Sequence, residues 1–557
     1  MTKTNIEIAQ SISLKPVENI AQQLGLPPGE IELYGRYKAK IPLHFIRPEK
    51  IAQNQLILVS AISPTPAGEG KTTVSIGLAQ GLNRLGKKTT VVLREPSLGP
   101  VFGMKGGATG GGYSQVLPME DINLHFNGDF AAVEKAHNLL AALIDNNIQS
   151  KKKSLNIDPR TVTWRRVMDM NDRSLRNIIV GLGGTSSGIP RETGFDITAA
   201  SEVMAILCLA ENISDLKTRL GNIFIGFTFD KKPIYARDLK ANGAMAALLK
   251  DAIKPNLVQT IEGTPAIIHG GPFANIAQGT NSVIATKMGL SWSDYVVTEA
   301  GFGFDLGAEK FFDIKCRYAG LFPAAVVLVA TVRALKYHGG ADLKNLREPD
   351  MEALAKGIEN LGKHIENIKL FNICPVVAIN RFESDTEEEI RFIADYCTSK
   401  GVQAEVADVF ARGGEGALAL ARRVILTAEK CPGEFTPLYD WNWSVERKIE
   451  TIAKKIYGAE AVDYTPKAKN HLRKILDLGL QNLPVCIAKT QKSLSDNPEL
   501  LGRPKDFVVT VREIEIAAGA GFLIPITGEI MRMPGLPDEP AAEHIDIDEN
   551  GQITGLF

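Results

Sequence analysis

The chain has almost no net charge. Its 63 Lys and Arg residues are balanced by 64 Asp and Glu residues, which leaves a formal net charge of −1. Nucleic acids and anionic membranes attract proteins through an excess of basic residues, so we expect neither as a partner. Any anion that the protein binds must instead be held by a few local groups.

Cysteine and histidine are scarce as well. The six cysteines are scattered, none of them has the C-x-x-C spacing of a metal site, and the eight histidines are equally dispersed. We therefore expect reduced cysteines in the core and no structural zinc site. The cysteines are Cys208, Cys316, Cys374, Cys397, Cys431 and Cys486.

The sequence also lacks a long apolar run. The most apolar segment, AGLFPAAVVLVATV at residues 319–332, is shorter than the roughly 20 residues of a membrane span and contains a proline. A buried strand is the better interpretation. Since the first residues, MTKTNIEIAQSISLK, have no apolar signal-peptide core, we expect a cytoplasmic protein.

What the chain does have is a globular composition with an excess of glycine. Hydrophobic residues make up 44% and charged residues 23%, while 51 of 557 residues are glycine, or about 9% against an average near 7%. Over the first 360 residues, short apolar runs alternate with glycine-rich turns and longer amphipathic stretches. This alternation is typical of β-α units around a mostly parallel sheet.

We therefore predict an α/β fold in which a P-loop NTPase-like large domain precedes two smaller α/β domains. The large domain, residues 1–360, would bind nucleotide and carry the catalytic groups. A second domain, residues 361–450, begins near the apolar run CPVVAI and ends at a segment rich in proline and tryptophan. The smaller C-terminal domain takes residues 451–557.

A candidate phosphate-binding loop follows the apolar strand QLILVSAIS of residues 55–63. The loop differs from the usual G-x-x-x-x-G-K-[ST] pattern only at Thr65, which replaces the first glycine. An amphipathic helix and another strand follow it, which brings backbone N–H groups and a helix N-terminus to one anion. The predicted nucleotide-binding residues are Thr65, Pro66, Ala67, Gly68, Glu69, Gly70, Lys71 and Thr72.

Two of these residues have side chains with a defined chemistry. Lys71 would place its charge on the outer phosphates, and the Thr72 hydroxyl would ligate magnesium. The alternative is a glycine turn with an incidental lysine. Even a true phosphate loop fits switches, partitioning ATPases, kinases and ligases equally well.

A glycine cluster and an arginine lie beside this loop. Seven glycines fall between Gly99 and Gly112, interleaved with aromatic, proline and charged residues that do not suit a flexible linker. Glycines so placed let the chain pass close to a bulky ligand. Arg94 and Glu95 end the strand before the cluster, where open α/β sheets bind ligands.

Two segments of the chain are long and irregular, GMKGGATGGGY at residues 103–113 and VATVRALKYHGG at residues 329–340. Both resemble signature segments of the formate-tetrahydrofolate ligase family, and they carry most of the resemblance. WRRVMDMNDR and HGGPFANIAQG extend it over nearly the whole chain. Members of this family join formate to tetrahydrofolate with MgATP, through formyl phosphate, and release ADP and phosphate.

The resemblance implies a catalytic set formed by Lys71, Arg94, Glu95, His125 and His269. Arg94 matches the family's formyl-phosphate arginine, although it could equally be the ion-pair partner of Glu95. His125 either contacts substrate or packs against the glycine cluster. His269 is either a ligand contact or a structural cap.

The resemblance also implies a flat slot for a ring. Phe382 matches a phenylalanine of the slot, whereas Phe410 stands where the family usually has tryptophan and would offer less stacking area. Phe302 would complete the pocket, and Asp129 could accept hydrogen bonds from the pterin. The alternative for each phenylalanine is a plain core side chain.

The resulting prediction is an ATP-dependent ligase whose substrates are formate, ATP and tetrahydrofolate. Magnesium, a monovalent cation and a homotetramer are implied by the resemblance alone. Two other functions share the phosphate loop: a P-loop ATPase switch, and a carboxylate-activating ligase of the dethiobiotin synthetase type. The switch class usually has a second lysine early in its loop and often a membrane-seeking terminal helix, and neither appears here. The glycine cluster and the HGG segment argue against the dethiobiotin synthetase type.

Overall fold

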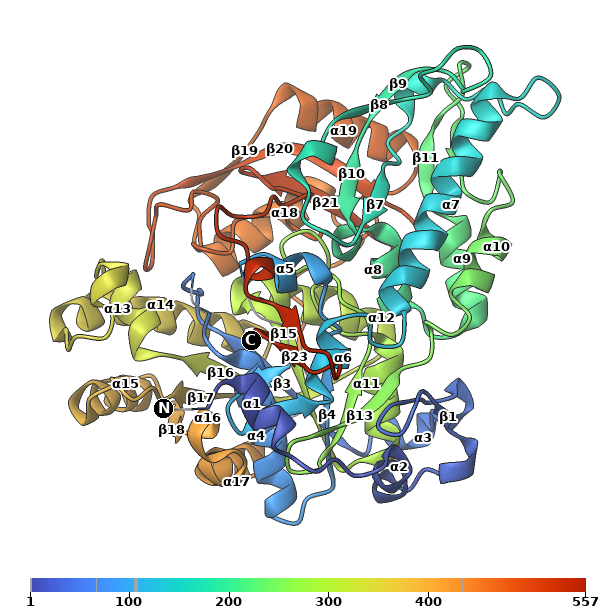
Figure 1. The fold of residues 1–557 in the computed structure, drawn as a ribbon. Helices are drawn as coiled ribbons and strands as arrows, with labels where there is room; N and C mark the ends of the chain where they lie inside the picture. Colours follow the sequence, from blue (N-terminus) through green and yellow to red (C-terminus); the bar gives the residue numbers. More distant parts are fainter. Residues whose placement is uncertain (1–2, 67, 105–108, 432–434, 557) are drawn as a thin grey trace.

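A twelve-stranded, mostly parallel sheet forms the centre of the molecule (Figure 1), as described by a computed structural model over residues 3–66, 68–104, 109–431 and 435–556. One edge is antiparallel and the rest is parallel. In spatial order the main strands are β1 (Glu32–Leu33), β2 (Ala39–Lys40), β13 (Asn256–Thr260), β14 (Pro265–Ile268), β4 (Thr89–Leu93), β15 (Tyr295–Gly303), β3 (Gln55–Ala61), β16 (Pro323–Ala330), β17 (Pro375–Asn380) and β18 (Gln403–Ala407). The predicted α/β class with a large, mostly parallel sheet is confirmed.

Helices cover both faces of this sheet, and the strand side chains divide between them. Ile57 and Val59 of β3 join the core that contains α4 (Lys71–Arg84) and α17 (Leu418–Lys430). Leu56 and Leu58 belong instead to the core that contains α11 (Val283–Trp292) and α14 (Met351–Leu370). Successive side chains of a strand point to opposite faces, so a run such as LILV is apolar throughout because both faces are buried.

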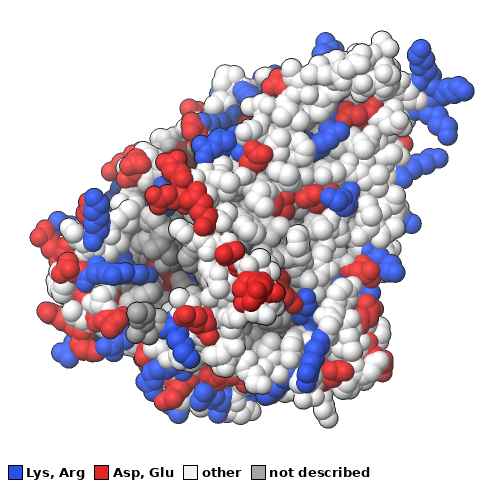
Figure 2. Space-filling view, in the orientation of Figure 1, with Lys and Arg blue, Asp and Glu red and all other residues white. Residues whose placement is uncertain are grey.

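The apolar segment at residues 319–332 contains β16, and all eight residues of that strand are buried. The prediction of a buried strand is therefore confirmed. Among the described residues, no helix has the length and apolar content needed to cross a bilayer. On the face seen in Figure 2, basic and acidic side chains are interspersed.

The strands of the predicted second domain extend the central sheet. β17 pairs in parallel with β16, and β18 pairs in parallel with β17. The helix α15 (Glu387–Ser399) connects these two strands. The boundary near residue 360 thus does not separate two sheets, and the domain limits stay a prediction.

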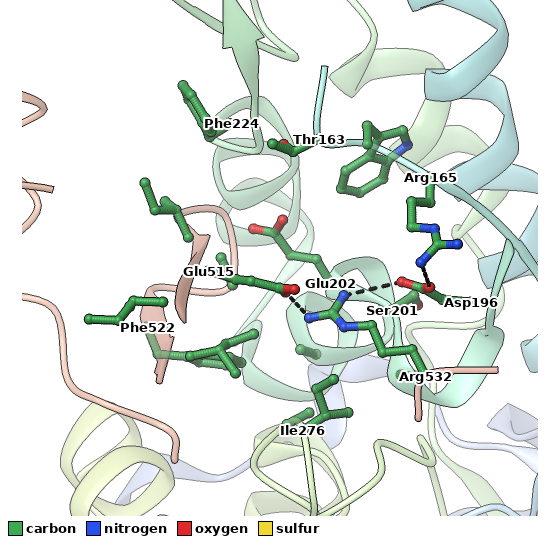
Figure 3. Close-up of a pocket in the computed structure, with 18 of the residues that line it drawn as sticks. Thr163, Arg165, Asp196, Ser201, Glu202, Phe224, Ile276, Glu515, Phe522 and Arg532 are labelled. Atoms are coloured by element: carbon green, nitrogen blue, oxygen red, sulfur yellow. Dashed lines mark hydrogen bonds and ion pairs between the residues drawn. The ribbon is translucent and has the colours of Figure 1, made fainter. Parts of the chain in front are cut away.

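A smaller sheet belongs to the C-terminal part of the chain. It consists of β19 (Ala461–Tyr464), β20 (Val508–Ala517) and β21 (Phe522–Thr527), next to α19 (Pro466–Asp477). Between this unit and residues 163–205 lies a cavity of about 320 Å³ (Figure 3). The walls of the cavity therefore come from distant parts of the sequence.

The prediction that all cysteines are reduced is wrong for two of them. Cys374, just before β17, forms a disulfide with Cys431, just after α17. These residues lie 57 positions apart in the sequence, and only the packing of α17 against β17 brings them together. The four other cysteines are free and buried, as expected.

Candidate functional site

The candidate phosphate loop leaves the carboxyl end of β3 and ends where α4 begins at Lys71. Gly68 and Gly70 both have positive φ angles, 78° and 71°, which a residue with a side chain adopts at a cost. A Cβ atom on Gly70 would also lie 2.5 Å from the side-chain amide nitrogen of Asn380. Ala67, which we predicted to bind nucleotide, lies outside the described residues.

The Glu69 side chain of this loop is turned into the protein. One carboxylate oxygen accepts hydrogen bonds from the backbone N–H of Thr65, at 2.8 Å, and from its hydroxyl, at 2.9 Å. The other oxygen accepts a hydrogen bond from the hydroxyl of Thr331. Asn380 donates to the Glu69 carbonyl at 3.0 Å. The ends of β16 and β17 thus fix the shape of the loop.

The segment of residues 329–340 contacts both the phosphate loop and a predicted ring of the slot. Thr331 caps α13 (Val332–His338) and bonds to Glu69. The guanidinium carbon of Arg333 lies 3.6 Å from the ring centre of Phe382, a cation–π geometry. His338 Nε2 lies 2.8 Å from the Ser63 carbonyl, just before the loop.

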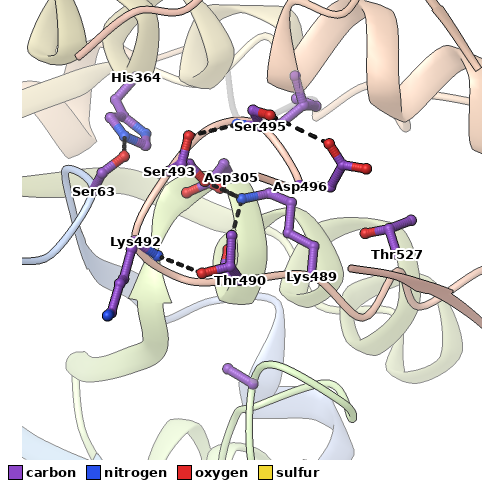
Figure 4. Close-up of polar contacts among 12 residues, drawn as sticks. Ser63, Asp305, His364, Lys489, Thr490, Lys492, Ser493, Ser495, Asp496 and Thr527 are labelled. Atoms are coloured by element: carbon purple, nitrogen blue, oxygen red, sulfur yellow. Dashed lines mark hydrogen bonds and ion pairs between the residues drawn. The ribbon is translucent and has the colours of Figure 1, made fainter. Parts of the chain in front are cut away.

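The C-terminal part of the chain reaches the same junction at Ser63. The Gly502 N–H donates to His338 Nδ1 at 3.1 Å, so His338 Nε2 carries the proton that the Ser63 carbonyl accepts. Asn360 donates to both the Gly502 carbonyl and the Ser63 hydroxyl. The Nε2 atom of His364 also lies 3.2 Å from the Ser63 hydroxyl oxygen (Figure 4).

A buried ion pair anchors the turn of residues 489–496 in the C-terminal part of the chain. The Lys489 ammonium lies 2.9 Å from Asp305 and donates to backbone carbonyls of this turn (Figure 4). Both side chains are almost fully buried. The C-terminal unit is therefore fixed to the segment that follows β15, close to the loop junction.

Glu299 is the point at which the loop and Arg94 meet. Thr72 donates its hydroxyl hydrogen to one Glu299 oxygen at 2.8 Å, and an Arg94 terminal nitrogen lies 3.8 Å from the other oxygen. Glu299 is 1% exposed and lies in the middle of β15, where the regular pairing of this strand with β3 ends. β15 runs between β3 and β4. A hydroxyl and a carboxylate so placed are hard oxygen ligands that suit magnesium.

Arg94 and Glu95 point to different surroundings. Besides its contact with Glu299, Arg94 donates to the Pro272 carbonyl at 3.2 Å. Glu95 is buried, and one of its oxygens has no hydrogen-bond partner among the described residues. Burial, and after it the nearby Asp129 carboxylate, raises the pKa of Glu95 well above its usual range. The ion-pair partner of Arg94 is therefore Glu299 rather than Glu95.

Asp129 already has protein partners. Its carboxylate lies 2.7 Å from the ammonium of Lys40, which is fully buried, and it accepts a hydrogen bond from Asn256 at 2.8 Å. His125 is exposed, four residues before it. The structure thus separates these two candidates, one within the core and one at the surface.

His269 is likewise enclosed by protein. One ring nitrogen lies 2.6 Å from the Ser282 hydroxyl and the other lies 2.6 Å from the Ala252 carbonyl. Burial lowers the pKa of His269 to about 4, so the ring is neutral at neutral pH. Both ring nitrogens thus have protein partners, as expected for a structural role of His269. A direct contact between His269 and a ligand stays a prediction.

The three phenylalanines of the predicted slot come from separate elements. Phe382 lies beneath Arg333, and Phe410 is 50% exposed beside the glycine cluster. A Cβ atom on Gly112 would lie 2.1 Å from the Phe410 carbonyl oxygen, which explains a glycine there. Phe302, partly buried with φ 58°, follows Glu299 by three residues.

Comparison with known proteins decides the family. The family model described as formate--tetrahydrofolate ligase matches residues 3–557. The chain belongs to the formate-tetrahydrofolate ligase family. It is an ATP-dependent enzyme that ligates formate to tetrahydrofolate, and the function predicted from the sequence is confirmed.

One solved structure gives a much weaker similarity to this ligase. A mutant of L. casei FPGS, in which serine replaces one glycine, is 13% identical, with coverage of 70% of this chain and 93% of that chain and a TM-score of 0.14. A TM-score this low carries no argument about the fold of the ligase.

Several residues at the ligase site were missed by sequence reasoning. Glu299 left a weak signal, an acid in the middle of the otherwise uncharged strand YVVTEAGFG. No sequence signal indicated the hydrogen bonds of Thr331 and Asn380 to the loop, or that of His338 to Ser63 just before it. These bonds depend on the order of strands in the sheet. That order places β16 beside β3 and β17 beside β16, although these strands are far apart in sequence.

Proposed function

We propose that the ligase binds the phosphates of ATP with residues 65–72 and clamps formate with Arg94. The observation that carries this proposal is the convergence of Thr72 and Arg94 on Glu299 at the carboxyl edge of the parallel sheet. Ligands of open α/β sheets bind at this edge. The arrangement would put the outer phosphate and the carboxylate of formate side by side.

The chemistry then needs two displacements. A formate oxygen attacks the γ-phosphorus of ATP, and the bond to the bridging oxygen breaks to release ADP. Formyl phosphate now has phosphate as its leaving group. The tetrahydrofolate amine attacks the formyl carbon, loses its proton and expels phosphate. Lys71 and Arg94 would stabilise the charge that develops on the phosphoryl oxygens.

Thr72 and Glu299 are the residues that we propose to hold magnesium. Their oxygens are 2.8 Å apart, and magnesium in such sites is bound by one or two protein oxygens together with substrate phosphates. When bound, the ion would neutralise phosphate charge. Glu299 would also keep Arg94 directed toward the loop.

We propose that tetrahydrofolate is held by rings near the loop. Phe382, kept in place by Arg333, and Phe410 would stack its flat ring, with Phe302 close to Arg94. Glu95, Asp129 and His269 would form the buried support behind Arg94. His125 would lie at the mouth of the site, since it is exposed.

Other parts of the proposal have two sources. The P-loop NTPase-like large domain, the domain limits near residues 360 and 450 and a cytoplasmic location follow from sequence patterns. A homotetramer and a bound monovalent cation rest on the resemblance to the family. A mass measurement in solution would test the homotetramer, and activity with and without potassium would test the cation.

The proposed roles are tested by Lys71→Ala and Arg94→Ala in an assay that omits each substrate in turn. Both variants should fold and lose product formation, whereas Arg84→Ala, whose side chain pairs with Glu262 at the surface, should retain it. Wild-type activity in the Arg94 variant would remove this residue from the mechanism. ATP consumption that does not require formate and tetrahydrofolate would contradict the proposed reaction.

A further inference from the structure

The cavity between the C-terminal sheet and residues 163–205 is not used by the proposed reaction. Its volume is about 320 Å³, which is within the size of small-molecule sites. Figure 3 shows Glu202, Glu515 and Arg532 directed toward its centre, with Phe224 and Phe522 at its sides. The apolar part of the wall comes mainly from Trp164, Phe224, Ile276, Ile514, Phe522 and Ile524.

A loop separates this cavity from the candidate reaction site. Ile276 and Ala277 line the cavity, while Pro272, a few residues earlier, accepts the hydrogen bond from Arg94. The loop is held by a bond from the Phe273 N–H to the Ala199 carbonyl. The same segment therefore contacts both the cavity and the candidate reaction site.

Two hydrogen-bond acceptors of the cavity wall are unfilled. One Glu202 oxygen accepts the backbone N–H groups of Gly519 and Ala520, at 2.7 and 3.2 Å, whereas no described residue donates to the other oxygen. His137 has one ring nitrogen bonded to the Arg165 carbonyl, and its Nδ1 is buried without a partner among the described residues. Of these two acceptors only His137 Nδ1 is fully buried, and a buried acceptor without a donor is costly.

Two arginines of the wall have carboxylate partners, since Arg532 bonds to Asp196 and Glu515, and Arg165 lies 3.4 Å from Asp196. Two donors remain among the described residues: Arg532 Nε is buried without a partner, and Lys474 lines the cavity without a carboxylate partner. The wall thus offers both acceptors and donors. It also offers a flat surface, because the rings of Trp164 and His137 stack at 4.0 Å with an angle of 16°.

We propose that this cavity is a second binding site, which takes a planar nitrogen heterocycle bearing an exocyclic amino group. The apolar walls suit the faces of such a ring, and the amino and ring N–H groups would donate to Glu202 and to the unfilled His137 nitrogen. Purine bases and pterins share this aminopyrimidine edge. Anionic ligands fit less well because Arg165 and Arg532 already have carboxylate partners.

Calorimetric titration of the full chain with four probes tests this site. Adenine and pterin carry the amino group, whereas purine and lumazine are matched rings without it. ATP and tetrahydrofolate are left out, because their own aminopyrimidine rings would compete with the probes for the cavity. The titrations are made at pH 8.5, where the Glu202 carboxyl is ionised, since burial raises its pKa to about 7. We expect adenine or pterin to bind about tenfold more tightly than its matched ring, since one hydrogen bond to a charged group contributes on the order of 1.5 kcal/mol. If adenine binds more tightly than pterin, the ligand of the cavity is a purine. If pterin binds more tightly, the ligand is a pterin.

Variants locate the binding. Glu202→Gln should weaken it about tenfold, and Ala205→Leu should abolish it by filling the cavity that Ala205 lines. Glu513→Gln is the control, since Glu513 also lines the cavity but pairs with Lys467. The ligase activity of all three variants should be retained, which separates this inference from the proposed reaction.

Three results would overturn the inference. One is no binding of any probe at millimolar concentration. Another is equal binding by wild type and the Glu202→Gln and Ala205→Leu variants. The third is loss of binding in Phe382→Leu instead, which would assign the probe to the proposed slot for tetrahydrofolate.

Discussion

Glu299 bonds to Thr72 with one carboxylate oxygen and faces Arg94 with the other. Because Thr72 lies in the first turn of α4 and Arg94 follows the strand β4, a single carboxylate links the nucleotide side of the site to the formate side. Sheet order explains the relationship, since β15 lies between β3 and β4. The residue is thus central to the proposed mechanism.

Replacing Glu299 should impair the chemical step. We expect Glu299→Gln to lower kcat by about 100-fold, the effect typical of losing one aligned electrostatic group in an active site. The fold should persist, because glutamine keeps the shape and the bond to Thr72. Steady-state kinetics would test this, with Glu262→Gln at the surface as the control. Unchanged kcat would show that Glu299 is only structural.

Thr331 should control the affinity for ATP through Glu69. Thr331→Val keeps the volume of the side chain but removes its hydrogen bond to the buried Glu69 carboxylate. We expect the KM for ATP to rise about tenfold, because the loop loses a bond to a charged group, with a smaller change in the KM for formate. Thr451→Val, whose hydroxyl bonds only to its own helix, should change neither. An equal rise in every KM would argue for general destabilisation.

Phe410 should accept a larger ring. It is half exposed beside Gly111 and Gly112, so tryptophan would extend toward solvent without entering the core. If the position stacks a substrate ring, Phe410→Trp should lower the KM for tetrahydrofolate or ATP about threefold. Phe382→Leu should raise the same constant. If both constants stay at their wild-type values, the two residues serve only packing.

The neutral His269 ring should make stability depend on pH. The unfolded ring has its usual pKa of 6.5, whereas burial lowers the pKa in the fold to about 4. Between these values the unfolded state binds the additional proton, so this contribution to stability is present above pH 6.5 and is lost as the pH falls to 4.

We therefore compare wild type with His269→Gln by denaturant unfolding from pH 7.5 to pH 4. The stability advantage of wild type should shrink on acidification, by about 3 kcal/mol at most. Since glutamine does not titrate, the difference between the two proteins isolates this residue from the other buried groups. A constant difference across the pH range would mean that His269 titrates alike in both states.

Local patterns predicted the α/β class, the large, mostly parallel sheet and several segments that surround the candidate site. The sequence predicted β3, α4, β4 and β16, because each of these elements has its own apolar periodicity or turn residues. Contacts that depend on which strands become neighbours were not visible. The bond from Thr331 to Glu69 spans 262 residues and that from Thr72 to Glu299 spans 227.

The disulfide illustrates the same difference. Spacing alone gave no reason to pair Cys374 with Cys431, since they are 57 residues apart. Their proximity follows from α17 packing beside β17. Likewise, the sequence could place Arg94 at a strand end but could not distinguish Glu299 from Glu95 as its partner.

The most direct test of the mechanism follows the oxygen atoms of formate. If a formate oxygen attacks the γ-phosphorus, that oxygen must leave with phosphate when the tetrahydrofolate amine takes the formyl group. Reaction with doubly ¹⁸O-labelled formate, followed by mass spectrometry of the phosphate, should give one ¹⁸O atom per phosphate formed. Phosphate without ¹⁸O would contradict the formyl phosphate intermediate and the role proposed for Arg94.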